Sequence, residues 1–235
     1  MLGGDVDREF REALVHQARA VRLLAGFLQD DLPPLHWTIG DGASTHQVEL
    51  TGFILAPRAR RVRAHLMPWA GHLGLSLSSE RTPRVVEFSA SSGRDGIGLA
   101  LFGAAPRWRS GFGRRPAAWT PPPLTGDAAE ETRHAQARLL ATLGELAEND
   151  LPVLSWHVPD RTEEGRWRLV GEISETGPDS RADVDEAGSV AREAVHRWGR
   201  FLEADPMEER LGRTYVRIRS SWKGTDIVID ADWPS

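Results

Sequence analysis

An internal repeat is the feature of this sequence that most constrains its fold. Residues 16–37 (HQARAVRLLAGFLQDDLPPLHW) align with residues 135–156 (AQARLLATLGELAENDLPVLSW) at a constant offset of 119, with nine of 22 positions identical. The same offset places 48–54 (VELTGFI) on 167–173 (WRLVGEI). Ten extra residues then enter the second copy, and from there Trp69 aligns with Trp198 at an offset of 129. We predict a tandem duplication of one structural unit, because self-similarity of this kind marks repeated supersecondary units.

Each copy shows the pattern helix, strand, strand, helix, strand, strand. In the second helix of the second copy, apolar or small residues advance by four, three, four, three and four from Val184 to Leu202, the spacing of one buried helical stripe. The strands alternate instead, so Trp37 and its counterpart Trp156 point inward. Gly52 and Gly171 lie on the inward side of the next strand, where we expect them to leave room for these indoles.

The last hairpin has a register that can be predicted. Lys223-Gly224 is a suitable two-residue turn, and pairing about it sets Arg217 opposite Asp230 and Ile218 opposite Ile229. Both partners of each pair then lie on one face, as antiparallel pairing requires. An offset of 130 carries this register to the first copy, where the expected pairs are Phe88 with Leu99 and Glu87 with Ala100.

These patterns predict an α+β fold. We expect two αββαββ repeats related by a pseudo-twofold axis, each with an antiparallel four-stranded sheet and two helices on one face. Edge strands of the two copies are expected to pair into one continuous sheet. The repeats span residues 8–102 and 128–233, and residues 103–127 form a linker rich in proline, glycine and arginine. An αββαββ unit with a tryptophan in its second helix (Trp69, Trp198) resembles the fold of type III secretion chaperone-like domains, a likeness of fold only.

Composition excludes several chemistries and compartments. There is no cysteine, which excludes disulfides, thiolate metal sites and cysteine nucleophiles. The net charge of −5 argues against nucleic acid as an obligate partner. No apolar run approaches the ~18 residues of a membrane span, and the charged N-terminal segment lacks the order of a signal peptide. We therefore expect a cytoplasmic protein that does not insert into membranes.

No catalytic or metal-binding constellation stands out. The eight histidines include no HxxxH or HExxH spacing, and no glycine-rich segment carries the lysine or the context of a phosphate-binding loop. Asp226, Asp230 and Asp232 share the outward face of the last strand, where they are able to bind a cation or to form a solvated surface opposite Arg217. We favour the surface, and we expect no catalytic residue, no metal and no cofactor.

The leading interpretation is a non-catalytic protein-interaction module, such as an adaptor, inhibitor or chaperone-like protein. It would bind another protein or itself, as a homo-oligomer, through the open sheet face or the edge strands, because that face diverges between the copies. The residues predicted to contact the partner are Phe53, Phe102, His157, Arg168, Tyr215, Arg217, Arg219, Asp230 and Asp232.

Two alternatives remain open. One is an enzyme or small-ligand binder that uses the cleft between the repeats, with His157, Arg217, Asp230 and Asp232 as its site. The other is nucleic-acid binding through the arginine-rich linker, in which aromatic side chains stack on bases and guanidinium groups contact phosphates. The residues of this linker set are Arg107, Trp108, Arg109, Phe112, Arg114 and Arg115.

Overall fold

One ten-stranded mixed sheet organises the molecule. A computed structural model of the chain describes residues 3–41, 48–94, 97–106, 127–161, 166–173, 181–210 and 213–234. The strand order is β3-β4-β5-β2-β1-β6-β7-β10-β9-β8. The strands are β1 (His36–Asp41), β2 (Val48–Leu55), β3 (Ser78–Arg81), β4 (Val85–Arg94), β5 (Ile97–Pro106), β6 (Ser155–Arg161), β7 (Trp167–Ile173), β8 (Met207–Arg210), β9 (Arg213–Trp222) and β10 (Thr225–Pro234).

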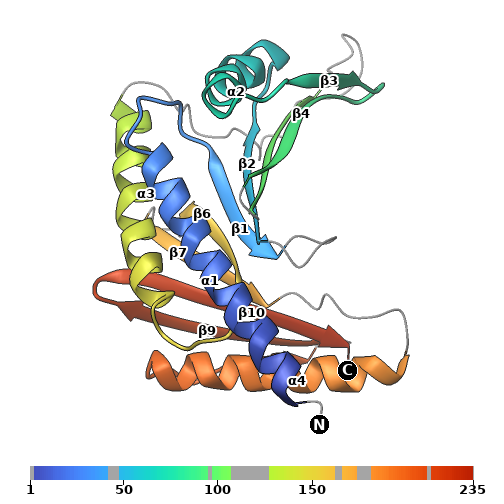
Figure 1. Cartoon of the computed structure of the whole chain (residues 1–235), viewed down its shortest axis with the longest axis vertical. Coiled ribbons are helices and arrows are strands. Elements are labelled where there is room, and N and C mark those ends of the chain that lie inside the picture. The colour runs from blue at the N-terminus through green and yellow to red at the C-terminus, as the bar shows by residue number, and fades with distance from the viewer. Residues whose placement is uncertain are drawn as a thin grey trace.

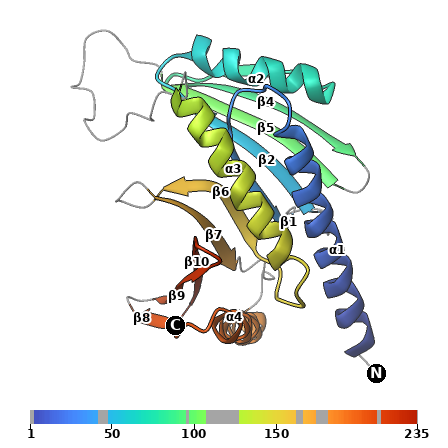
Figure 2. The ribbon, with the colours of Figure 1, turned by 90° about the vertical axis from the view of Figure 1, so that its left-hand side faces the viewer.

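Four helices cover one face of this sheet and leave the other face open. They are α1 (Gly3–Phe27), α2 (Ala59–Leu73), α3 (Asp127–Leu146) and α4 (Arg181–Phe201). Helices α1 and α3 lie side by side across the middle, α2 covers the β4–β5 end and α4 covers the β9–β10 end (Figure 1). Helices α1 and α3 lie in front of β1 and β6 when the molecule is seen from the helix side (Figure 2). The sheet curves away from these helices, so its open face is concave (Figure 1). No helix in the described ranges is long and apolar enough to cross a membrane.

The two halves of the sheet meet at β1 and β6, which pair antiparallel with Thr38 opposite His157. Buried glutamines connect the halves on the helix side. Gln17 Nε2 on α1 donates a hydrogen bond to the carbonyl of Leu154 at 2.5 Å, and Gln136 Nε2 on α3 donates to the carbonyl of Leu35. Each helix therefore binds the backbone just before the first strand of the other half.

Tryptophan pairs form the centre of each half of the core. The ring centroids of Trp37 and Trp69 lie 4.9 Å apart, and those of Trp156 and Trp198 lie 5.6 Å apart, both edge to face. Trp69 and Trp198, on α2 and α4, donate their indole N–H groups to the carbonyls of Pro33 and Pro152 at 2.6 and 3.0 Å. These bonds satisfy the polar atom that a buried indole brings with it.

The glycines opposite the first-strand tryptophans are required by packing, as the sequence predicts. A Cβ atom on Gly52 would lie 2.8 Å from the Trp37 ring, and one on Gly171 would lie 2.7 Å from Leu154 and 3.0 Å from the Trp156 ring. All three distances fall below ordinary carbon–carbon contact. The prediction that these glycines accommodate the indoles is confirmed.

The predicted antiparallel four-stranded sheet in each repeat is wrong. Each half has five strands, and within it β2 pairs parallel with β5, as β7 does with β10. The chain leaves β2 through α2, crosses the helix face and forms the β3–β4–β5 meander, so β5 returns in the direction of β2. The additional strand β3 carries four exposed residues and no apolar alternation, which is why the pattern gave no sign of it.

The hairpin register is confirmed in the second half and wrong in the first. Arg217 lies opposite Asp230, and Ile218 opposite Ile229. In the first half, Phe88 lies opposite Gly103 rather than Leu99, and Glu87 opposite Ala104 rather than Ala100. The offset that relates the two hairpins is 128, since Leu101 and Ile229 pair with Gly52 and Gly171 respectively. A shift of two residues leaves every side chain on the same face of the sheet. The requirement that paired residues share a face is therefore met by both registers and could not distinguish them.

Candidate functional site

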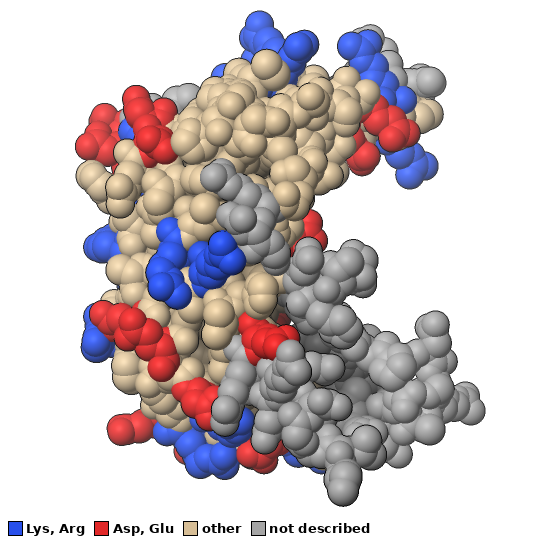
Figure 3. Space-filling view, in the orientation of Figure 1, with Lys and Arg blue, Asp and Glu red and all other residues tan. Residues whose placement is uncertain are grey.

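A depression on the open face lies where the two halves of the sheet meet. Its volume is about 230 Å³, and it belongs to four neighbouring strands: β2, β1, β6 and β7. The space-filling view shows the outline hollowed on the side away from α1 and α3 (Figure 3). We call this depression the junction pocket, and the residues that line it are His36, Trp37, Phe53, His157, Val158, Val170 and Glu172.

Strand alternation places the outward-pointing lining residues in the junction pocket. Trp156 and Leu169 point toward the helices and are buried, so their neighbours His157 and Val170 point to the open face. On the first half, Trp37 is buried and His36 points outward. The antiparallel pairing of β1 with β6 then brings outward residues from both halves to one place.

One wall of the junction pocket is aromatic. His36 on β1 lies opposite Phe53 on β2, and their rings stack with centroids 5.2 Å apart and an interplanar angle of 27°. Phe102 on β5 lies beside Phe53 in the parallel register and is 37% exposed, although it does not line the pocket. The aromatic surface therefore extends from the pocket along the open face.

The other wall is polar and acidic. His157 Nδ1 lies 3.3 Å from Thr38 Oγ1, and His157 Nε2 lies 3.2 Å from a carboxylate oxygen of Glu172. Which atom donates in the first contact depends on the tautomer of the ring. In the second contact the alignment is not that of a hydrogen bond, so the buried Nε2 has no hydrogen-bond partner among the described residues. The Glu172 side chain is half exposed.

A second polar cluster lies on β9 and β10, and its groups bind one another. Arg217 donates two hydrogen bonds to the carboxylate of Asp230, at 2.6 and 2.8 Å, and its guanidinium lies 5.2 Å from the ring centroid of Tyr215. Burial and a hydrogen bond with Asp230 raise the pKa of Tyr215 to about 12, and the Asp230 charge acts in the same direction, while Arg217 opposes it. The charged and polar groups of this cluster are therefore paired with one another, and the cluster does not resemble a ligand-binding site.

The nine residues predicted to contact a partner do not form one site in the structure. Phe53 and His157 line the junction pocket, with Phe102 beside Phe53 outside the lining, while Tyr215, Arg217 and Asp230 form the β9–β10 cluster. Arg168 lies on β7 beside Asp226, and Arg219 and Asp232 are exposed. The residues predicted for nucleic acid, Arg107, Trp108, Arg109, Phe112, Arg114 and Arg115, fall outside the described residues.

Arginines pair with Asp226 and Asp230 on the acidic strand. Asp226 lies 2.9 Å from Arg166, and Asp230 binds Arg217. Within the described ranges, no group of three or more histidines, aspartates and glutamates is arranged to hold a metal ion. These ion pairs favour the interpretation of this strand as a solvated, charged surface over its interpretation as a cation site.

Sequence reasoning did not select His36, Val170 or Glu172 as site residues. Each carries an ordinary outward side chain on its own strand, and only the pairing of β1 with β6 brings His36 close to the residues of the second half. A usable signal did exist. If the first strands of two repeats pair antiparallel about matched positions, the outward residues of both strands and of their neighbours meet at one place.

No protein-family model matches this chain, and no curated protein matches it. Among solved structures, the chain is similar to a methylmalonyl-CoA epimerase, with 13% sequence identity and a TM-score of 0.21. The alignment covers 79% of this chain and 94% of the epimerase chain. A likeness at this TM-score carries no argument about function.

Proposed function

We propose that the protein binds a small amine-bearing aromatic compound in the junction pocket. The observation that carries the proposal is the contrast between the two walls. Phe53 and Glu172 are matched positions of the sequence repeat, 119 residues apart, yet one is aromatic and the other is a carboxylate. A ligand that complements both walls has a ring for one end and a cation for the other.

Charge and hydrogen bonding support the same ligand. Glu172 is the one carboxylate in the lining of the junction pocket, and no arginine or lysine lines it. An ammonium group beside the half-exposed Glu172 carboxylate gains a charge-assisted hydrogen bond. The volume of about 230 Å³ suits a small compound, below the 300–1,000 Å³ typical of pockets for larger ligands.

We favour a small ligand over a protein partner for this face. Of the large apolar side chains described as exposed, Val15, Met67, Phe102, Val190 and Met207, only Phe102 and Met207 lie on the open sheet face, and they lie in opposite halves of the sheet, on β5 and β8. A docking surface for a protein is expected to show a contiguous apolar patch. The protein-interaction hypothesis stays a prediction, as does self-association. The proposal concerns binding and assigns no catalytic residue.

Isothermal titration calorimetry with tyramine tests the proposal. For a ligand of this size we expect a Kd of about 1 mM. Phe53→Ala should abolish measurable binding because it removes the aromatic wall. Phe102→Ala is the matched control, since Phe102 lies on the adjoining strand, outside the lining, and should leave the Kd unchanged. No heat of binding with the wild-type protein, or equal binding by both variants, would contradict the proposal.

A further inference from the structure

A second depression lies at the β3–β4 end of the sheet, on the helix side. Its volume is about 310 Å³, larger than that of the junction pocket. It is formed by the first two turns of α2 and by the strands β3 and β4, and we call it the arginine pocket. The residues that line it are Ala59, Arg60, Arg63, Ser79, Arg81, Val86 and Phe88.

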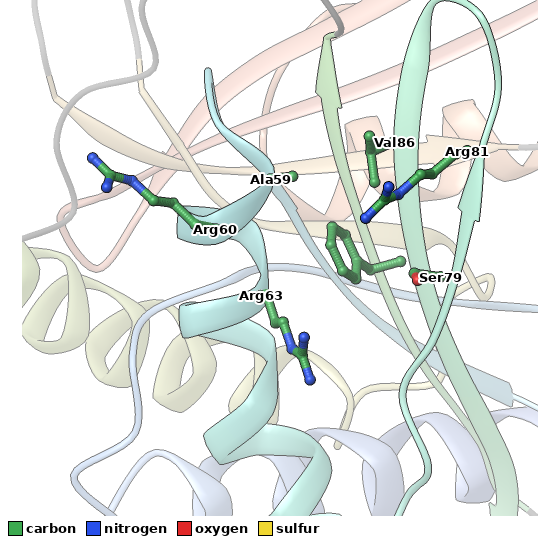
Figure 4. A pocket seen from close by; sticks show the side chains of 7 residues that line it. Ala59, Arg60, Arg63, Ser79, Arg81 and Val86 are labelled. Atoms are coloured by element: carbon green, nitrogen blue, oxygen red, sulfur yellow. The ribbon is translucent and has the colours of Figure 1, made fainter.

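Three arginines and no acidic residue line the arginine pocket. Arg63 and Arg81 extend from α2 and β3 into the space between the helix and the hairpin, while Arg60 extends toward the outer side of α2 (Figure 4). No hydrogen bond or ion pair joins the side chain of Arg60, Arg63 or Arg81 to another residue in the described part of the chain. Elsewhere on this surface arginines do pair, as Arg133 does with Asp31.

Strand alternation keeps the nearby carboxylates away from this space. Glu80 and Glu87 lie opposite each other on β3 and β4, one residue away from Arg81 and Phe88. Because successive residues of a strand point to opposite faces, these glutamates point to the open face of the sheet. The first turn of α2 contains no acidic residue either. Clustered like charges repel, so this arrangement costs free energy unless an anion neutralises it.

We infer that the arginine pocket binds the phosphate groups of a small phosphorylated compound. Guanidinium groups bind phosphate oxygens through paired, charge-assisted hydrogen bonds, and two guanidiniums from different elements are able to bind one diphosphate from both sides. The Ser79 hydroxyl supplies another donor, and Val86 is an apolar contact for the remainder of the ligand. The limited volume of about 310 Å³ favours a small molecule over a nucleic acid, which binds along an extended basic track.

This site is independent of the junction pocket. It uses residues of α2, β3 and β4 on the helix side, whereas the junction pocket uses β1, β2, β6 and β7 on the open face. Binding at one site is therefore measurable when the other is altered, and failure of one proposal leaves the other standing.

Titration calorimetry of the full chain with inorganic pyrophosphate tests the inference. Arg63→Gln and Arg81→Gln should each weaken binding about tenfold or more, since each removes a charge-assisted contact. The matched control is Arg138→Gln, which changes an exposed arginine of α3 outside the pocket and should leave the Kd unchanged. Because all three side chains are exposed, circular dichroism and the thermal midpoint without pyrophosphate should match the wild type.

Two results would overturn the inference. One is binding that is absent in the wild type or equal in Arg63→Gln, Arg81→Gln and Arg138→Gln. The other is a single-stranded oligonucleotide that binds more tightly than pyrophosphate, with an affinity that falls steeply with salt and depends on Arg63 and Arg81, because that result assigns the arginines to a nucleic acid.

Discussion

Thr38 and His157 lie opposite each other on β1 and β6, with Oγ1 and Nδ1 3.3 Å apart, and they are matched positions of the sequence repeat. Matched residues that face each other mark the centre of the sheet. The side chains around this centre come from both halves but differ between them, and so the pocket has an aromatic wall and an acidic wall. A symmetric sheet thus carries a site suited to an asymmetric ligand.

Gly171→Val should destabilise the protein by about 1–3 kcal/mol, because the new side chain would overlap Leu154 and Trp156. Urea denaturation measures the loss as a lower midpoint. Gly144→Ala is a suitable control, because a Cβ atom there meets nothing within 4 Å and alanine favours the helix. A midpoint for Gly171→Val equal to that of the wild type would show that the packing around Trp156 is looser than described.

Gln136→Ala should cost about 1–3 kcal/mol of stability, since it removes a buried hydrogen bond to the carbonyl of Leu35 and leaves that group without this donor. Gln17→Ala should have a similar effect through the carbonyl of Leu154. Gln29→Ala, at an exposed position after α1, should change the stability little. If all three variants unfold at the same urea concentration, the reciprocal bonds between the halves do not stabilise the fold.

Stability should fall as the pH rises from about 10 to about 12. Tyr215 has a raised pKa of about 12 in the folded protein, against 10.0 for a free tyrosine, so the unfolded state releases its proton first. Folding then favours the protonated form, and this contribution is present below pH 10.0 and lost as the pH approaches about 12.

The chain contains a single tyrosine, which makes this prediction directly measurable. Near-ultraviolet absorbance of tyrosinate should titrate with a midpoint of about 12, and Tyr215→Phe should remove the signal. Asp230→Asn should lower the midpoint only in part, because burial is the larger cause of the shift. A wild-type midpoint near 10.0 would contradict the described environment of Tyr215.

Local patterns sufficed for the parts of the fold that depend on short-range geometry. The inward direction of Trp37 and Trp156 follows from strand alternation, and the pairing of Arg217 with Asp230 follows from the Lys223-Gly224 turn. The parallel pairing of β2 with β5 could not be predicted, because it depends on where the chain returns after α2. Nothing in the exposed residues of β3 distinguishes a strand from a loop.

The candidate site was harder to predict than the fold for the same reason. Phe53 and His157 were predicted as outward residues of a functional face, but their proximity depends on the register between β1 and β6. That register joins strands about 120 residues apart. Glu172 lies beside His157 through the pairing of β6 with β7, and only the pairing of β1 with β6 brings both residues close to His36 and Phe53.

The charge preference of the junction pocket tests the central proposal most directly. Titration of the wild-type protein should show that tyramine binds about fivefold more tightly than 4-hydroxyphenylacetate, the size expected for one half-exposed ion pair. Glu172→Gln should abolish this preference and leave both compounds with similar affinity. Equal affinity of the two compounds for the wild-type protein, or a preference that survives Glu172→Gln, would contradict the assignment of Glu172 as the cation-binding wall of the site.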